Sequence, residues 1–409
     1  MRRVVVTGLG AVTPIGNNVK DMWESVEAGK CGIAPITHYD TTGRKVCLAG
    51  EVKDFHPEEY VEKSELRKMD PFTQFALAAA GEAMADSGLD MEKEDALRCG
   101  IIFSSGIGGL GTIQNECTRG LEKGFDRVSP HFIPMSISNM AAGHIAIKYG
   151  FHGMCTCVVT ACAGATNAIG DAFRQVRDGY HDVMLCGGSE ASITPLGIGG
   201  FSSMKALSTA TDPARASIPF DKERGGFVMG EGAGVLVLEE YEHAVKRGAK
   251  IYCEMVGYGA TCDANHVTAP LADGSMAAKA MEKAMEDGGV APEQITYINA
   301  HGTSTSLNDK GETKAIKLAF GEAAKKVMIS STKSMTGHLL GASGAVEAII
   351  TVLSVKNDLV PPTIHYQVPD EECDLDYVPN QARKARVEYA MSNSLGFGGH
   401  NASVVFKKI

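Results

Sequence analysis

Short apolar runs rich in valine, isoleucine and alanine alternate along the chain with longer segments of helical period. Runs of four to eight such residues bounded by glycine predict buried strands, and recurrence every three to four residues predicts helices. We expect strands at 3–7, 100–104, 156–160, 183–186, 234–238, 251–258, 295–299, 327–330, 390–394 and 403–406. We expect helices at 72–87, 163–177, 277–287, 310–320 and 339–356. This alternation is typical of an α/β protein with largely buried sheets.

Two segments repeat in outline, which suggests an internal duplication. Residues 6–11 read VTGLGA and residues 255–260 read MVGYGA. The small-residue segment that follows Cys162 also resembles the segment that follows His338. Two similar halves, at 1–250 and 251–409, would place both side chains in one central cleft. Chance similarity between small-residue helices is the alternative.

Composition and charge narrow the class of protein. The 409 residues are 44% hydrophobic and 22% charged, as in a globular protein, and the net charge of −10 argues against general nucleic-acid binding. No apolar run reaches the roughly 18 residues that a membrane span needs. The first residues, MRRVVVTG, are too soon broken by glycine for a signal peptide. Together with an odd number of cysteines, eleven, this predicts free thiols and a cytoplasmic location.

Cys162 follows a β-branched run and precedes a helix of small residues. The positive end of a helix dipole favours an anion, so we expect this position to lower the pKa of the thiol. The pattern indicates a nucleophile, and an inert buried thiol is the alternative.

Three further side chains stand at the ends of apolar strands in the second half: His301, Lys333 and His338. Polar groups on loops at strand ends commonly carry function, so catalysis is favoured over a structural role. Zinc binding by Cys162 and the two histidines is disfavoured, because the three residues include no closely spaced ligand pair.

Two glycine motifs remain. Residues 106–111 fit the G-x-G-x-x-G pattern of dinucleotide sites, but no acidic residue ends a second strand about 20 residues later, which favours a packing loop. Residues 393–401, NSLGFGGHN, predict an aromatic gate around Phe397 with a backbone N–H aimed at an oxyanion, a hairpin turn, or both.

Together these motifs resemble the β-ketoacyl-[acyl-carrier-protein] synthases, the elongating condensing enzymes of fatty-acid synthesis, and the synthase II type most closely. The resemblance covers nearly the whole chain. It rests on the Cys162 turn and on residues 219–224, 226–232, 299–305, 330–341 and 396–399.

The resemblance implies the thiolase fold, with two pseudo-duplicated halves in five layers α-β-α-β-α, and a homodimer. It implies that Cys162 accepts the acyl chain from acyl carrier protein and that His301 and His338 handle malonyl carrier protein. Lys333 would lie behind the histidines and pair with Glu312. The backbone N–H groups of Cys162 and Phe397 would form the oxyanion hole.

Further roles are implied in the same way. The substrate would contact the acyl pocket and the pantetheine site through Ile107, Phe201, Thr268, Thr303, Thr305 and Gly398. Acidic carrier protein would dock on Lys63, Arg67, Lys68 and Lys205. Catalysis would need no cofactor, although Na⁺ or K⁺ would bind at Asn299, Ala300, Glu347, Ser392 and Asn393.

Four alternatives bear on this interpretation. A thiolase would need a second catalytic cysteine where Phe397 stands, and a non-catalytic partner subunit would lack Cys162. A nucleotide-binding oxidoreductase rests only on the 106–111 loop. A type II polyketide ketosynthase shares the catalytic residues and stays open, because only its substrates distinguish it.

Overall fold

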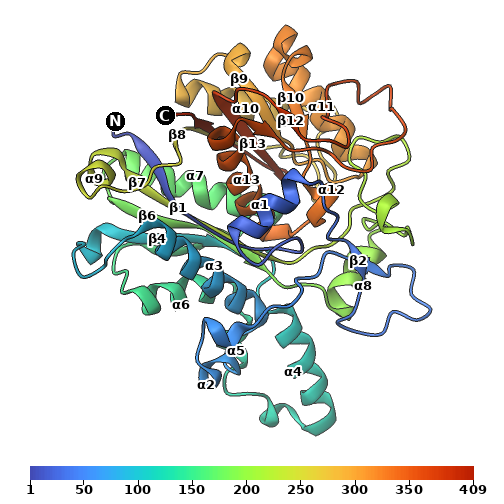
Figure 1. Ribbon diagram of the computed structural model, residues 1–409. Coiled ribbons are helices and arrows are strands. Elements are labelled where there is room, and N and C mark those ends of the chain that lie inside the picture. The colour runs from blue at the N-terminus through green and yellow to red at the C-terminus, as the bar shows by residue number, and fades with distance from the viewer.

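The computed structural model describes residues 1–409 and is built on one ten-stranded sheet (Figure 1). All ten strands expected from the hydrophobic pattern are present, most of them longer than expected. Their bounds are β1 (Val4–Val12), β4 (Cys99–Ser104), β5 (Cys155–Val158), β6 (Val183–Glu190), β7 (Gly232–Glu240), β8 (Cys253–Cys262), β9 (Ile295–Asn299), β10 (Met328–Ser330), β13 (Tyr389–Gly396) and β14 (His400–Lys407).

The strand order shows the expected duplication. The sheet runs β10-β9-β13-β14-β8-β1-β7-β6-β4-β5. When the five strands of each half are numbered in chain order, both halves read 3-2-4-5-1 from the outer edge inward. Antiparallel pairing of β1 with β8, in which Val4 faces Met255, joins the halves. The sheet is therefore continuous across the junction, and the boundary at 250/251 stays a prediction.

Helices cover the sheet in layers. In Figure 1, α3 (Pro71–Ser87) and α6 (Met140–Tyr149) cover the outer face of the N-terminal half, and α10 (Ser275–Gly288) and α11 (Ser306–Phe320) cover that of the C-terminal half. Between the two halves lie α7 (Gly164–Arg177) and α13 (Ser343–Asn357). The remaining elements are α1 (Val19–Glu27), α2 (Lys63–Leu66), α4 (Leu110–Lys123), α5 (Phe132–Ser136), α8 (Pro195–Ser203), α9 (Tyr241–Lys246), α12 (Lys333–Thr336), β2 (Ala34–Pro35), β3 (Leu48–Ala49), β11 (Leu359–Val360) and β12 (Arg383–Lys384).

Burial explains why the inner strands and the middle helices look apolar throughout. In β6, Met184 and Cys186 face the middle helices, whereas Val183 and Leu185 face α3. Every residue of α13 from Ser343 to Val355 is buried, so this helix has no polar face. The five-layer thiolase architecture expected from the resemblance is confirmed by this arrangement.

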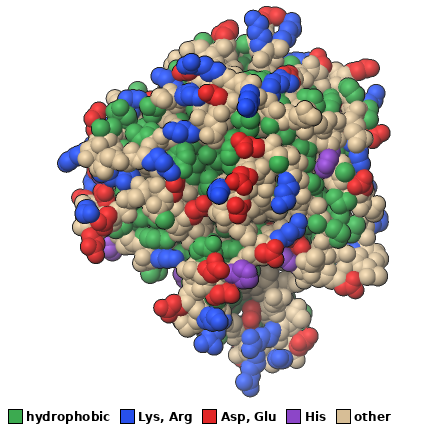
Figure 2. All heavy atoms as spheres, viewed as in Figure 1, with side chains coloured by type: hydrophobic (Ala, Val, Ile, Leu, Met, Phe, Trp, Pro, Cys, Tyr) green, Lys and Arg blue, Asp and Glu red, His purple; other side chains and the backbone are tan.

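The surface carries charges of both signs, and one part of it projects. Helices α2, α4 and α5 form a lobe that extends away from the sheet (Figure 1). Acidic and basic side chains are intermixed over the visible face, and basic side chains gather at the tip of the lobe (Figure 2). No helix is both long enough and apolar enough to cross a membrane.

The repeated G-x-G motif has a packing role in each half. A Cβ at Gly10 would lie 1.9 Å from the carbonyl oxygen of Ala79 in α3. A Cβ at Gly259 would lie 2.1 Å from the carbonyl oxygen of Ala280 in α10. The first strand of each half therefore needs glycine so that the backbone of the covering helix can approach.

We predict that Gly10→Ala and Gly259→Ala each lower the free energy of unfolding by about 1–3 kcal/mol, because α3 or α10 must shift. Gly143→Ala is the control: Gly143 is in helix α6, and an added Cβ meets no atom within 4 Å. This substitution should stabilise the protein by up to about 1 kcal/mol through helix propensity. Urea unfolding measures all three variants, and a Gly10→Ala protein as stable as wild type contradicts the packing argument.

Candidate active site

Cys162 lies in a tight turn between β5 and α7. A single 3₁₀ turn, Ala161–Ala163, precedes the helix, and Ala161 has a left-handed backbone with φ of 50°. Such strain in a residue other than glycine is characteristic of functional sites. The Cys162 side chain is buried, with 8% of the residue exposed. The turn therefore holds the thiol in a fixed direction at the start of α7.

The second half contains the same turn. The 3₁₀ turn Leu340–Ala342 precedes α13, and Leu340 has φ of 49°. Counted from the helix start, Gly341 is the structural equivalent of Cys162, and His338 lies three residues before Gly341. The duplication is confirmed. The sequence comparison matched Cys162 with His338, whereas the structure matches Cys162 with Gly341, three residues later.

The expected catalytic side chains meet in one cavity of about 390 Å³. Cys162 from the first half and His301, His338 and Phe397 from the second all line it. Of the expected substrate contacts, Phe201, Thr268, Thr303 and Thr305 also line the cavity. Ile107 packs in the apolar cluster that contains Cys162 and Phe201.

The two histidines form a perpendicular pair, with ring centroids 5.2 Å apart. Lys333 Nζ lies 3.4 Å from His301 Nδ1. Because an ammonium group only donates, Nδ1 accepts and the ring hydrogen lies on Nε2. Ser343 Oγ lies 2.9 Å from His338 Nδ1, and a hydroxyl that donates there places the ring hydrogen of His338 on Nε2 too.

Both imidazoles are held in the neutral form. Burial lowers the pKa of His301 and of His338 well below the usual value, and the positive charge of Lys333 lowers both further. A neutral ring with hydrogen on Nε2 is a hydrogen-bond donor that carries no positive charge. The pair can therefore donate two hydrogen bonds to one developing oxyanion.

The partner of Lys333 differs from the expectation. Lys333 forms a buried ion pair with Glu347, and not with Glu312. Glu312 instead accepts hydrogen bonds from the backbone N–H groups of His301 and Gly302, both at 2.8 Å. Lys333 and Glu347 are 1% and 3% exposed, so each charge depends on the other for compensation.

The pKa of the nucleophile also differs from the expectation. Burial raises the pKa of the Cys162 thiol to about 12, and the negative charge of Glu190 contributes to the rise. Lys333 and hydrogen bonds from the backbone N–H groups of Phe397 and Cys162 act in the opposite direction. The expected lowering is therefore wrong: the thiol is protonated at neutral pH and would have to lose its proton to act as a nucleophile.

A row of contacting aromatic rings lines the cavity. The Phe397 ring centroid lies 6.3 Å from that of Phe201, which lies 5.5 Å from Phe227, which lies 5.2 Å from His338. A Cβ at Gly396 would lie 3.3 Å from the backbone nitrogen of Cys162, so glycine lets the Phe397 loop approach the nucleophile.

Gly398 is placed differently from the other expected substrate contacts. It is absent from the cavity lining, and its N–H donates to the carbonyl of Val267 at 2.6 Å. It supports the loop beside the cavity.

Sequence reasoning missed Glu190. Its buried carboxylate accepts hydrogen bonds from the backbone N–H groups of Gly106 at 2.8 Å, Ile107 at 3.2 Å and Gly341 at 3.0 Å. It thus joins the 106–111 loop of one half to the α13 turn of the other. Because Glu190 uses the N–H groups that would bind a phosphate, the loop loses its resemblance to a dinucleotide site. An acidic residue at the end of an apolar strand was the available signal.

The expected docking residues do not form one group in the chain. Lys63 begins the short helix α2, Arg67 and Lys68 follow it, and Lys68 pairs with Glu65 at 2.6 Å. Lys205 lies just after α8 and lines the cavity. Figure 1 shows α2 and α8 in separate parts of the molecule.

Two similar halves together supply a buried thiol, two neutral imidazoles and a lysine behind them. This combination of fold and site is that of a condensing enzyme of the thiolase fold. The family model of the β-ketoacyl synthase N-terminal domain matches residues 1–244, and that of the C-terminal domain matches residues 252–367. The chain belongs to the β-ketoacyl synthase family.

Relatives of high identity share one name. The chain is 53% identical over 408 residues to a 3-oxoacyl-[acyl-carrier-protein] synthase 2 of Synechocystis sp., covering 100% of this chain and 98% of the relative. It is 54% identical over 407 residues to a protein of the same name from Staphylococcus aureus, with the same coverage.

A solved structure agrees in fold. It is a type II polyketide synthase ketosynthase in complex with its acyl carrier protein and bound to the hexaketide. It is 37% identical to this chain with a TM-score of 0.92, and the match covers 100% of this chain and 99% of that one.

We predict that alkylation of Cys162 by iodoacetamide accelerates about tenfold per pH unit from about pH 7 to about pH 10, because only the thiolate reacts. Mass spectrometry of the Cys162 peptide measures the rate. Cys117 is an exposed cysteine of the same chain and serves as the reference for the reagent. A rate at Cys162 that is constant above neutral pH contradicts a raised pKa.

Proposed function

We propose that this protein is a 3-oxoacyl-[acyl-carrier-protein] synthase that elongates fatty acids. It joins an acyl chain to the two-carbon unit of malonyl carrier protein and releases CO₂ and free carrier protein. The observation that carries this conclusion is the meeting of Cys162 with two neutral histidines in one cavity. This set suits an acyl acceptor beside a site that stabilises a thioester oxyanion.

In the first step, the Cys162 sulfur attacks the thioester carbonyl of acyl carrier protein. A bond forms from sulfur to the acyl carbon, the thiol proton leaves, and the carrier departs as a thiol that takes up a proton. The backbone N–H groups of Phe397 and Cys162 face the sulfur and would donate to the oxyanion of the tetrahedral intermediate.

In the second step, malonyl carrier protein loses CO₂ and the electron pair of the broken bond moves into the thioester as an enolate. The Nε2–H groups of His301 and His338 would donate to the enolate oxygen. One such donor is typically worth about 3 kcal/mol of transition-state stabilisation. The enolate carbon then attacks the acyl carbonyl, and the bond to Cys162 breaks. The Cys162 sulfur leaves as a thiolate that takes up a proton, and the product is a 3-oxoacyl chain, two carbons longer, on the carrier.

A polyketide ketosynthase would use the same residues. The fatty-acid assignment is favoured because the full-length relatives at 53–54% identity are named 3-oxoacyl-[acyl-carrier-protein] synthase 2, whereas the polyketide ketosynthase structure is 37% identical.

Carrier protein would reach the cavity over a basic surface. Lys205 lines the cavity, and basic side chains gather at the tip of the projecting lobe, in another part of the molecule (Figure 2). Lys63, Arg67 and Lys68 complete the proposed docking set. Charge reversal at Arg67 should raise the KM for acyl carrier protein, and an unchanged KM contradicts the docking set.

The protein is proposed to act as a homodimer in the cytoplasm. Strand β5 is at the edge of the sheet, and the apolar residues Met154 and Val159 at its ends are 41% and 54% exposed. An unpaired edge with exposed apolar residues favours pairing with a second chain. Sedimentation analysis would find a monomer if this is wrong.

All eleven cysteines are free, which agrees with a reducing compartment.

The proposed cation site has an unusual feature in this structure. Asn299 Oδ1, Glu347 Oε2 and Ser392 Oγ are buried and lack a hydrogen-bond partner. Oxygen ligands suit a hard cation, so these residues fit Na⁺ or K⁺ together with the expected Ala300 and Asn393. The cation would compensate the buried oxygens. If K⁺ binds there, it should raise the unfolding temperature relative to tetramethylammonium, and Ser392→Ala should remove the difference.

We predict that Cys162→Ser lowers condensation by about 10³-fold or more, because the acyl chain loses its acceptor. We predict that His338→Ala lowers release of CO₂ by about 10²–10³-fold, because one oxyanion donor is lost, while acyl transfer to Cys162 continues. The assay combines purified protein, malonyl carrier protein and acyl carrier proteins of graded length, and products are identified by mass.

Cys117→Ser serves as the matched control, since Cys117 is exposed and distant in sequence from every expected catalytic residue. Intact mass after acyl carrier protein alone reports acyl transfer separately. The mechanism fails if Cys162→Ser still elongates acyl chains, or if His338→Ala releases CO₂ at the wild-type rate. Graded chain lengths also reveal the preferred substrate.

A further inference from the structure

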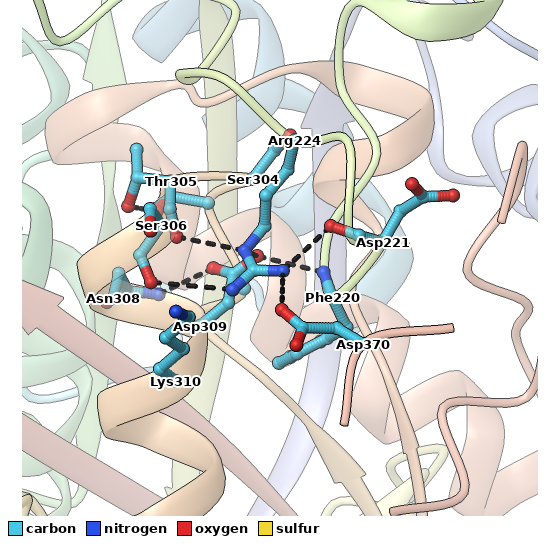
Figure 3. A network of polar contacts seen from close by, with 12 residues as sticks. Phe220, Asp221, Arg224, Ser304, Thr305, Ser306, Asn308, Asp309, Lys310 and Asp370 are labelled. Carbon is cyan, nitrogen blue, oxygen red and sulfur yellow. Dashed lines mark hydrogen bonds and ion pairs between the residues drawn. The ribbon is translucent and has the colours of Figure 1, made fainter. Parts of the chain in front are cut away.

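Arg224 is a buried arginine that the mechanism does not use. Its side chain is 2% exposed, and it lies between the turn at 220–226 and the start of α11 (Figure 3). It is not part of the cavity lining. A buried guanidinium costs free energy unless all its donors are paired, so its partners show what it holds in place.

Those partners come from three separate segments. Arg224 Nη1 donates to the Asp221 carbonyl and to the Asp370 carboxylate, both at 2.7 Å. On the other side, Nε donates to the Thr305 carbonyl at 3.3 Å and Nη2 to the Ser306 carbonyl at 3.5 Å. The carboxylate of Asp309, in the first turn of α11, lies 3.5 Å from Nε.

Two of these segments contribute residues to the cavity lining. Gly225 and Gly226 line the cavity from one side, and Thr303 and Thr305 line it from the other. Gly226 N–H donates to the Ser304 carbonyl at 3.1 Å, so the segments are in contact.

The 303–306 loop is held in a strained conformation. Ser304 has φ of 68°, in the left-handed region that residues other than glycine rarely adopt. In this conformation Thr303 Oγ1 and Thr305 Oγ1 lie 2.9 Å apart and form a hydrogen-bonded pair of hydroxyls beside the cavity. Such strain persists only where the surrounding contacts impose it.

We propose that Arg224 is a positioning residue for recognition of the substrate arm: it holds the 303–306 loop so that the Thr303–Thr305 hydroxyl pair can bind the amide-bearing arm of a carrier thioester. This inference rests on the proposed function, which supplies such a thioester as substrate. The guanidinium acts through the loop carbonyls and does not touch the substrate. Lysine cannot replace it, because a single ammonium cannot reach both Asp370 and the two carbonyls in one plane.

The test is Arg224→Lys, which keeps the charge and removes the planar fork. We expect the KM for acyl carrier protein to rise about tenfold, which corresponds to about 1.4 kcal/mol, with kcat within about twofold of wild type. A matched substrate isolates the arm: an acyl ethanethiol thioester has the same acyl group and no amides. The kcat/KM for the ethanethiol thioester should be the same in the wild-type protein and in Arg224→Lys.

The control variant is Arg215→Lys. Arg215 also binds Asp221, at 3.1 Å, and the His365 carbonyl at 2.8 Å, but it makes no contact with the 303–306 loop. This variant should keep the wild-type KM. If Arg224→Lys does not fold, Asp370→Asn is the second variant. It weakens the anchor of Arg224 and should raise the same KM by a smaller factor.

The outcomes separate the two levels of the proposal. If the wild-type protein does not elongate acyl chains at all, the proposed function fails. If it does, an unchanged KM in a folded Arg224→Lys or Asp370→Asn protein overturns the positioning role. Equal losses with the carrier thioester and with the ethanethiol thioester also overturn it, because they indicate general damage.

Discussion

The structure depends on the close packing of two helices between the halves of the sheet. Helices α7 and α13 cross in the middle layer, and a Cβ at Gly344 would lie 2.1 Å from Thr166 Oγ1. Such an approach requires small residues on both helices, which is why both segments are rich in glycine and alanine. The same constraint brings the N-terminal turns of the two helices together. One of these turns carries Cys162, and His338 lies two residues before the other, Leu340–Ala342.

Buried charges complete the site that this packing creates. Glu190 binds N–H groups from both halves, Glu312 binds the backbone at His301, and Glu347 pairs with Lys333. Each carboxylate is buried, and each accepts from donors that also fix a functional segment, although Glu347 Oε2 keeps no hydrogen-bond partner. Lys333 in turn orients His301 and lowers the pKa of both histidines. The electrostatics that favour neutral donors are therefore part of the framework.

Much of the fold could be predicted from local sequence pattern, whereas the ion-pair partners and the pKa shifts of the site could not. The ten strands and the duplication follow from hydrophobic period and from repeated glycines, which are local properties. The partner of Lys333 does not follow from local pattern. Glu312 and Glu347 both lie in helices, and only tertiary packing decides which of them pairs with the lysine. The pKa of Cys162 was misjudged for a similar reason: the helix start is visible in the sequence, whereas the burial that outweighs it is not. Glu190 and Arg224 bind mainly backbone groups of distant segments, so their partners cannot be identified from the sequence, although the place of Glu190 at the end of an apolar strand is visible there.

The geometry also constrains the order of the two steps. One cavity holds Cys162, both histidines and the Thr303–Thr305 pair, so in the proposed mechanism both carrier thioesters would bind at the same place. If the cavity admits one arm at a time, the first carrier would have to leave before malonyl carrier protein enters. In the proposed mechanism the acyl chain would remain on Cys162 during this exchange, which would require a covalent bond and exclusion of water. The apolar cluster around Cys162 and the ring of Phe397 meet the second requirement. Burial that would protect a thioester on Cys162 also raises the pKa of the free thiol.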